Sequence, residues 1–565
     1  IEVTFSPGEK AGAFDNKTYI LEVNKTNNYV TIPNDFKTTI DMLEESYYKK
    51  VDDETFYFDE GDYSYTFTGW KIKGATKYIP METVFQPGDI VDYNTLNINE
   101  NETVELEAIW GKVIYAQNEY TGRYYTDYWI YDKEYTEKNY TATGAWNYKY
   151  EDEKLILNNG QDLENPVSSV DYAYYLFYQQ NYNNELSNIE DKNAYSYVIM
   201  LTGDLDYIKS NDNGKNQEHY FRNYDIYDGK NYDSTKNYIF GNYTAQQNFF
   251  GYASGFSKTG TLAATFNGGN IAYSPSITFK SYNNAQYYLY INGYGYYDSV
   301  YNSIRFDGIY YKAALNTKRP QVTSPVTVGS ETAFLGGVNT CLEFTQRANA
   351  SGFSVLRTNC VQTVVFNGGT FPSWQTSWSS DQKVERYDYE LHWYMGQKAQ
   401  INDEITLGTT ARYENSKSVI SQNFEFTITG GYVKNIYGGS YGMNSTSMGQ
   451  RKIKIIGDKG PNRTTNPIIT NVYGTAKSGK FIGESYINII GATDITNVYG
   501  GGCDFTATTY GNTHINIENS IVKGDIYGGG YNGNVRKKED LTGKIEFNNV
   551  VFKYDGNENP TINNF

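Results

Sequence analysis

The chain has 565 residues and a formal net charge of −17 at pH 7, and aromatic residues make up 17% of it. Tyrosine contributes 59 residues, glycine 53 and proline 12, a profile that predicts many short strands and turns. The same profile excludes a disordered linker and a collagen, and a long helical bundle is disfavoured because Ala, Leu, Glu and Lys do not dominate. The acidic balance argues against nucleic-acid partners, and no apolar run is long enough for membrane insertion of this segment.

Residues 1–112 are predicted to form a small β-rich module of their own. Strands are expected at 1–5, 19–23 and 29–32, and one short helix at 38–49, from the alternation of apolar and polar residues. Three phrases follow in order: Phe67-Thr-Gly-Trp70, Phe85-Gln-Pro-Gly-Asp89 and a closing strand from Val104 to Trp110. Trp70 and Trp110 are the expected core anchors, because so small a domain needs large apolar side chains.

These three phrases resemble the internalin-type B repeat, or Listeria–Bacteroides repeat, of bacterial surface proteins. The family pattern has an aromatic–Thr–Gly–Trp strand, a Pro-Gly-Asp turn and a closing strand that ends in Trp. The resemblance covers nearly the whole module and implies a β-grasp-like fold that acts as a spacer. The single copy departs from the tandem arrays that are common in the family.

Two segments separate this module from the rest of the chain. Residues 113–165 are predicted to be a Tyr-rich connector that packs on the next domain, through Tyr124, Tyr125, Tyr128, Trp129 and Trp146. Residues 166–194 are predicted to contain a short amphipathic helix that starts near Asn165-Pro-Val-Ser-Ser169. Such a helix would cap the exposed end of a strand array.

Residues 195–565 repeat a short strand followed by a Gly or Asn turn and a second strand. The second strand carries the phrase Asn-x-Tyr-Gly, whose tyrosines are Tyr437, Tyr473, Tyr499 and Tyr527, at steps of 36, 26 and 28 residues. A unit this short cannot bury its apolar face alone, but stacked units can place each residue over its copy. The pattern therefore predicts an all-β right-handed parallel β-helix, a solenoid whose inserted loops point outward. It also resembles β-helical, adhesin-like surface proteins of Gram-positive and related gut microbes.

The clearest departure from repetition lies between Phe371 and Gly396. Five of its side chains are the candidate ligand-binding residues: Trp374, Trp378, His392, Trp393 and Tyr394. In an extended loop, flat aromatic faces would stack on sugar rings or anchor a protein partner. The alternative is that this segment folds back and packs on the flank of the β-helix.

Cysteine and metal chemistry have little support in the sequence. Cys341 and Cys360 are 19 residues apart, so they can face each other on adjacent turns as a disulfide or remain two buried thiols. No zinc spacing occurs, and the acidic turns at 210–214 and 555–558 leave structural calcium as a weak option. No other cofactor is expected.

Together these features predict an extracellular protein, secreted or associated with the cell wall, that is adhesin-like and displays loops to a glycan or protein on a host or neighbouring cell. A β-helical polysaccharide lyase or glycoside hydrolase is the enzymatic alternative. It is disfavoured because the regular repeats carry few charges and an acidic protein repels polyuronates. A self-associating surface-layer or filament subunit is the third hypothesis.

Overall fold

A computed structural model describes the fold of most of the chain. The described residues are 1–8, 17–23, 27–33, 48–58, 62–96, 103–117, 148–151, 154–157, 160–167, 173, 197–206, 277–292, 296–299, 303–314, 330–359, 361–379, 384–386, 388–411, 417–458, 466–536, 544–548, 551–552 and 562–563. Most of the expected helix at 38–49 and of the expected helical cap at 166–194 lies outside these residues. The connector residues Tyr124, Tyr125, Tyr128, Trp129 and Trp146 also lie outside them.

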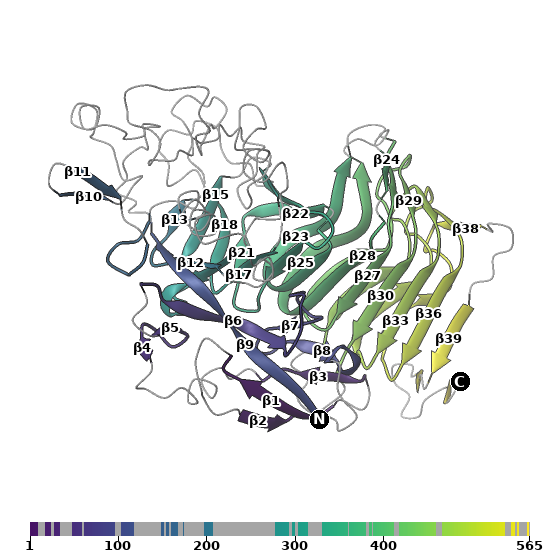
Figure 1. The fold of residues 1–565 in the computed structure, drawn as a ribbon. Coiled ribbons are helices and arrows are strands. Elements are labelled where there is room, and N and C mark those ends of the chain that lie inside the picture. The colour runs from purple at the N-terminus through teal and green to yellow at the C-terminus, as the bar shows by residue number, and fades with distance from the viewer. Residues whose placement is uncertain are drawn as a thin grey trace, which may run out of the picture.

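Strands dominate the described structure, so the predicted all-β class is confirmed (Figure 1). The only helices with described bounds are two short 3-10 helices, η3 (Tyr93–Leu96) and η6 (Tyr282–Asn284). Two small antiparallel pairs lie apart from the large sheets: β10 (Tyr148–Glu151) with β11 (Lys154–Leu157), and β40 (Val551–Phe552) with β41 (Ile562–Asn563).

The N-terminal module is built around the long strand β9. Its strands are β1 (Glu2–Ser6), β2 (Lys17–Ile20), β3 (Tyr29–Thr31), β4 (Tyr48–Lys50), β5 (Thr55–Phe58), β6 (Tyr65–Ile72), β7 (Val84–Phe85), β8 (Ile90–Asp92) and β9 (Thr103–Ala116). Trp70 is buried in the module core, where its ring lies 4.7 Å from that of Phe5. Trp110 is half-buried and donates from Nε1 to the Pro7 carbonyl at 2.7 Å.

Strand β9 joins this module to the rest of the molecule. Its first part pairs with β1 and β6, and its last residues, Lys112 to Ala116, pair in parallel with β12 (Tyr197–Leu201). The boundary expected after residue 112 therefore falls inside a continuous strand.

Beyond β12 the chain forms three ladders of parallel strands. The first ladder contains β12, β14 (Ile277–Ser281), β17 (Ser303–Asp307), β20 (Cys341–Phe344), β23 (Thr363–Ser379), β25 (Leu391–Ala411), β27 (Phe424–Ile428), β30 (Arg451–Ile456), β33 (Ser485–Ile490), β36 (Thr513–Glu518) and β39 (Lys544–Asn548). The second contains β16 (Tyr296–Ser299), β19 (Ser330–Leu335), β22 (Phe353–Asn359), the later parts of β23 and β25, β28 (Tyr432–Tyr437), β31 (Ile468–Tyr473), β34 (Asp494–Tyr499) and β37 (Ile526–Tyr527).

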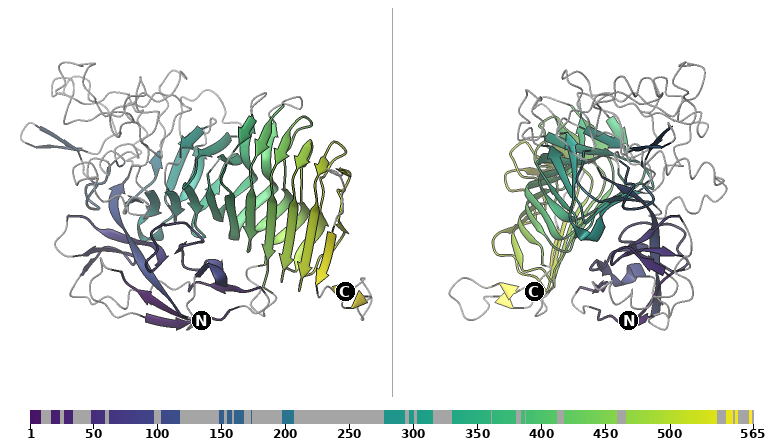
Figure 2. Two further views of the ribbon diagram at one scale, coloured as in Figure 1. Left: turned by 45° about the vertical axis from the view of Figure 1, so that its right-hand side comes forward. Right: turned by 90° about the vertical axis from the view of Figure 1, so that its left-hand side faces the viewer.

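The third ladder has two separate parts. The first part is β13 (Leu205–Asp206), β15 (Tyr288–Asn292), β18 (Tyr310–Ala314) and β21 (Asn349–Ser351). The second part is β24 (Val384–Arg386), β26 (Val419–Ser421), β29 (Thr446–Met448), β32 (Lys480–Ile482), β35 (Thr508–Tyr510) and β38 (Asn534–Arg536). The chain returns to the first ladder after each passage through the others, and we call one such passage a rung (Figure 2).

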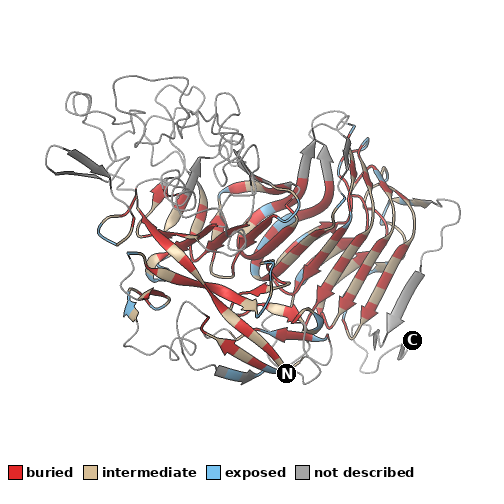
Figure 3. Cartoon of the chain, in the orientation of Figure 1, coloured by how far each residue is buried: buried red, intermediate tan, exposed pale blue. Residues whose placement is uncertain are grey.

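Register along the ladders places like residues over like, as the repeats predicted. Tyr437, Tyr473, Tyr499 and Tyr527 are successive register partners in the second ladder. In the first ladder Ile453, Ile487 and Ile515 are likewise in register. The buried positions alternate along the strands of the ladders (Figure 3). The apolar ones form a continuous core that is aromatic near Phe306 and Phe344 and isoleucine-rich toward the later rungs.

The N-terminal module packs against the outward face of the first ladder. The Lys280 ammonium donates to the Phe67 carbonyl at 3.0 Å, and Asn27 donates to the Gly457 carbonyl at 2.7 Å. The Gln397 side chain donates to the Gly88 carbonyl at 2.8 Å. The module therefore lies alongside the ladder, which differs from the expectation of a spacer.

Charged side chains are paired in this interface, and four of them are buried: Lys280, Arg305, Asp307 and Glu343. Glu54 of the module accepts from Lys280 at 2.5 Å and from Arg347 at 2.7 Å, and Arg347 also pairs with Asp307 at 2.5 Å. Arg305 donates from Nε to Glu343 at 2.7 Å and from Nη1 to the Thr68 carbonyl of the module. Buried charges are tolerated when they are paired and hydrogen-bonded, so these pairs fix how the module sits on the ladder.

Asp89 is one further carboxyl group in this interface. Burial and the nearby charge of Glu343 raise the pKa of Asp89 to about 8, although the Gln86 N–H and Arg305 act in the opposite direction. Asp89 also accepts from the Asn367 side chain at 3.2 Å. The carboxyl is therefore protonated at neutral pH, where it adds no negative charge to the interface.

We expect Asp89 to make the folded protein less stable as pH rises. The folded state keeps a proton that the unfolded chain loses at the ordinary carboxyl pKa, so the free energy of unfolding should fall as pH rises toward about 8. Asp89→Asn should flatten this slope between about pH 4 and 8 in urea titrations. An unchanged slope in the variant would contradict the assignment.

The pKa of Asp307, by contrast, is lowered by Arg347 and Lys280 against the effect of burial, so that group does not titrate in this range.

Candidate functional site

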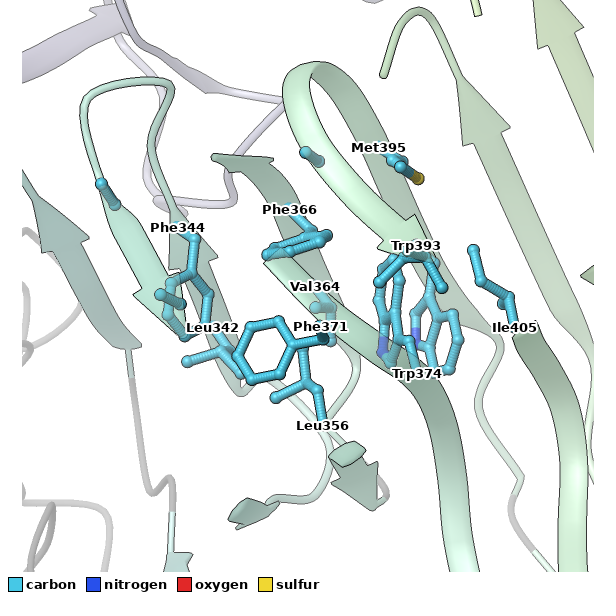
Figure 4. Close-up of a cluster of buried hydrophobic side chains, with 14 of the residues drawn as sticks. Leu342, Phe344, Leu356, Val364, Phe366, Phe371, Trp374, Trp393, Met395 and Ile405 are labelled. Atoms are coloured by element: carbon cyan, nitrogen blue, oxygen red, sulfur yellow. The ribbon is translucent and has the colours of Figure 1, made fainter. Parts of the chain in front are cut away.

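The tryptophans predicted to face a ligand are buried instead. Trp374 lies in β23 and Trp393 in β25, and both are 0% exposed. Their rings stack at 4.1 Å between centroids and 9° between planes, inside the hydrophobic core (Figure 4). The prediction of a display loop at these residues is wrong, because the segment continues as paired strands and each tryptophan occupies an inward position.

Two of the other three candidates, His392 and Tyr394, do not form an exposed site either. His392 and Tyr394 lie on the outward side of β25, where both are half-buried. Tyr394 packs against the core of the N-terminal module, and burial there raises its pKa. Trp378 belongs to β23, but its side chain lies outside the described part of the structure.

Cys341 is a buried free thiol, and burial raises its pKa to about 12. The disulfide considered for Cys341 and Cys360 is therefore not formed, although Cys360 itself lies outside the described residues. The acidic turns at 210–214 and 555–558 also lie outside them. Among the residues that are described, no group of three or more His, Cys, Asp or Glu could hold a metal ion, and no helix could span a membrane.

The tyrosines of the Asn-x-Tyr-Gly phrases stack on one another, each at the C-terminal end of its strand in the second ladder. Ring centroids are 5.1 Å apart for Tyr437 and Tyr473, 4.9 Å for Tyr473 and Tyr499, and 5.6 Å for Tyr499 and Tyr527. The planes of these pairs are within 13° of parallel. The first three rings are buried and Tyr527 is 51% exposed.

The glycine after each tyrosine allows the turns to stack closely. Gly438 N–H donates to the Tyr473 carbonyl at 2.9 Å, and Gly474 N–H donates to the Tyr499 carbonyl at 2.8 Å. A Cβ atom on Gly438 would lie 2.0 Å from the Gly474 carbonyl oxygen, so no larger residue fits. The Tyr-Gly turns are therefore held in register from rung to rung.

These turns carry an exposed group of large apolar side chains, which we call the aromatic corner: Tyr441, Met443, Phe505, Tyr527 and Tyr531. Phe505 is 78% exposed and Tyr531 is 58% exposed. Backbone bonds join the turns, since Asp504 N–H donates to the Lys477 carbonyl and Tyr531 N–H to the Gly502 carbonyl. The Lys477 ammonium also lies 4.4 Å from the centre of the Tyr441 ring.

Half of the large hydrophobic side chains that are exposed in the described structure lie at this corner. These side chains lie on neighbouring turns that are hydrogen-bonded to one another, and exposed apolar side chains placed in this way can form an interaction surface. Sequence reasoning identified the Tyr-Gly-Gly turns but missed the corner. The available signal was an extra aromatic residue just beyond the glycines, at Tyr441, Phe505 and Tyr531.

The geometry of the aromatic corner suits recognition more than chemistry. Its rings offer large rigid contact area, and Lys477 supplies a cation that is held by Glu404 and by two tyrosine rings.

The chain matches no protein-family model, and no curated protein or solved structure is significantly similar to it.

Proposed function

We propose that the protein is an extracellular, adhesin-like surface protein that binds a glycan or protein on a host or neighbouring cell through the aromatic corner. In this proposal the three ladders form a right-handed parallel β-helix that acts as a stiff support. Residues 1–112 are then an internalin-type B repeat that braces one flank of this support.

The exposed aromatic corner is the observation that carries this proposal. Tyrosine and other aromatic side chains dominate binding hot spots because they bury a large area and lose little conformational entropy. Phe505 and Tyr531 are exposed at 78% and 58%, so both rings are available to a partner. The stacked Tyr-Gly turns below them fix their positions, which lowers the entropy cost of binding.

Support from the ladders is mechanical. Each added rung lengthens a parallel stack by about 4.8 Å, so the ladders form an extended and regular scaffold. Such a scaffold presents loops at a distance from the cell that carries it. The acidic net charge of −17 favours ligands that are not polyanions.

We expect the double variant Phe505→Ala/Tyr531→Ala to lose at least tenfold in affinity, because hot-spot rings each contribute more than about 1.4 kcal/mol. Binding of the purified protein would be measured on glycan arrays, on extracellular-matrix proteins and on cells. Val338→Ala is the matched control, since Val338 is 58% exposed but lies outside the corner.

Retained binding in the double variant, within twofold of the wild type, would contradict the role of the corner. Sedimentation at several concentrations, with and without calcium, tests the alternative that the corner joins copies of this chain. In that case the double variant would change the oligomeric state and leave cell binding unaltered.

A further inference from the structure

A second surface with the features of a binding site lies on the first ladder, away from the aromatic corner. It is a depression of about 530 Å³, lined by residues of the strands β30, β33 and β36. These three strands are neighbours in the first ladder (Figure 1). Its polar lining residues are Gln450, Lys452, Lys454, Tyr486, Asn488, His514 and Asn516. Pockets of this volume accept small ligands.

The lining residues form two parallel rows, here called files, that run across the strands because the strands are in register. In the first file Lys452, Tyr486 and His514 are partners, and the Tyr486 and His514 rings stack at 4.4 Å with 5° between planes. In the second file Asn516 donates to the Asn488 side chain at 2.7 Å. Since neighbouring strands are about 4.8 Å apart, each file presents polar groups over roughly 10 Å.

The charges of the two lysines are already neutralised within the protein. Lys452 pairs with Glu390 at 3.2 Å and with Glu425 at 3.6 Å, and Lys454 pairs with Glu425 at 2.5 Å. The ammonium groups are therefore fixed in place without offering a free positive charge. An anionic ligand would gain little from them, and it would approach a strongly acidic molecule.

His514 contributes a polar atom that lacks a partner. Its Nε2 is buried and has no hydrogen-bond partner among the described residues. A buried ring nitrogen without a partner costs free energy, and that cost would be removed if ligand binding turned the ring so that a hydroxyl could reach this atom.

We propose that this depression binds an uncharged oligosaccharide that crosses the strands from β30 to β36. Sugar hydroxyls suit a lining of amide, phenol and imidazole groups, and the C–H faces of the sugar suit the ring edges and lysine stems. This site is distinct from the aromatic corner, which follows the second ladder.

The test uses the full chain and isothermal titration calorimetry with cellotetraose, xylotetraose and mannotetraose, and with trigalacturonate as the acidic probe. We expect at least one neutral tetrasaccharide to bind. His514→Phe keeps a ring against Tyr486 but removes both nitrogens, so it should weaken that binding at least tenfold.

Two pairs of stacked asparagine side chains provide a matched pair of variants. Asn516→Ala removes the donor to Asn488 inside the depression, and Asn497→Ala removes the equivalent donor to Asn471, at 2.8 Å, in the second ladder. The first should weaken tetrasaccharide binding and the second should leave it unchanged. Equal effects of the two would overturn the proposal, because they would reflect ladder stability.

Other outcomes are equally decisive. Failure of the wild type to bind any neutral tetrasaccharide, or binding of trigalacturonate alone, would overturn the proposal. The variant Phe505→Ala/Tyr531→Ala should bind the tetrasaccharide normally. Failure at the aromatic corner and failure at this depression are therefore separate results.

Discussion

Replacing Trp374 with alanine is expected to lower the free energy of unfolding by about 3–5 kcal/mol, the range for deleting a large buried aromatic side chain. Trp374 is fully buried, and its ring stacks on Trp393 and meets Phe366 and Phe426 at 5.6 Å. Urea unfolding followed by circular dichroism would measure the loss. Tyr531→Ala is the control, because removing an exposed ring should change stability by less than about 0.5 kcal/mol.

Phenylalanine variants sharpen this prediction. Trp374 donates from Nε1 to the Thr358 hydroxyl at 2.9 Å, whereas the buried Trp393 Nε1 has no partner among the described residues. Trp374→Phe breaks a hydrogen bond, and Trp393→Phe removes an unsatisfied donor. Trp374→Phe should therefore cost about 1 kcal/mol more than Trp393→Phe.

Stability equal to that of the wild type in Trp374→Ala, together with lost cell binding, would show that this tryptophan faces a ligand. The burial of the pair predicts the opposite combination, which is lost stability and, in the molecules that remain folded, retained binding.

The repeated part of the fold could be predicted from sequence because register is encoded there directly. A tyrosine at 437, 473, 499 and 527 can stack on its copies only if the strands run parallel and in register, and the ladders are paired in this way. Similar reasoning placed Trp70 in the core of the module, where it is 2% exposed.

The aromatic segment at 371–396 could not be placed because tryptophan is equally at home in a core and in a binding loop. Its strands are longer than the repeats: β23 runs from Thr363 to Ser379, its register shifts between Phe366 and Gly368, and its two ends belong to different ladders. Periodicity does not reveal such a shift in register.

The contact between module and ladder was missed for a different reason. Lys280, Arg305 and Glu343 alternate with apolar residues in their strands, a pattern that normally indicates a solvent-exposed face. All three are buried here because the module covers them. Local sequence patterns do not show which segment of the chain will cover a polar face, because that depends on how the whole chain folds.

The ion pair between Arg305 and Glu343 gives the second large prediction. Their side chains are 1% and 2% exposed, and the Arg305 Nε lies 2.7 Å from Glu343 Oε2. Burial raises the pKa of Glu343, and the positive charge of Arg305 acts against that rise. Glu343→Leu alone would leave the guanidinium buried without its carboxylate, which should cost about 3–5 kcal/mol in unfolding free energy.

The double variant Arg305→Leu/Glu343→Leu should recover most of this loss, because two apolar side chains replace two desolvated charges. The control is Glu105→Leu, which breaks the exposed Lys73–Glu105 pair, with 60% and 32% of the side chains accessible, and should cost less than about 1 kcal/mol. A Glu343→Leu variant no less stable than this control would mean that the module does not cover the pair. Arg305 also donates to the Thr68 carbonyl in β6, and the double variant removes this hydrogen bond. The loss of stability that persists in the double variant would therefore measure how much this contact contributes to docking of the module. Faster amide exchange in β6 would be the accompanying sign.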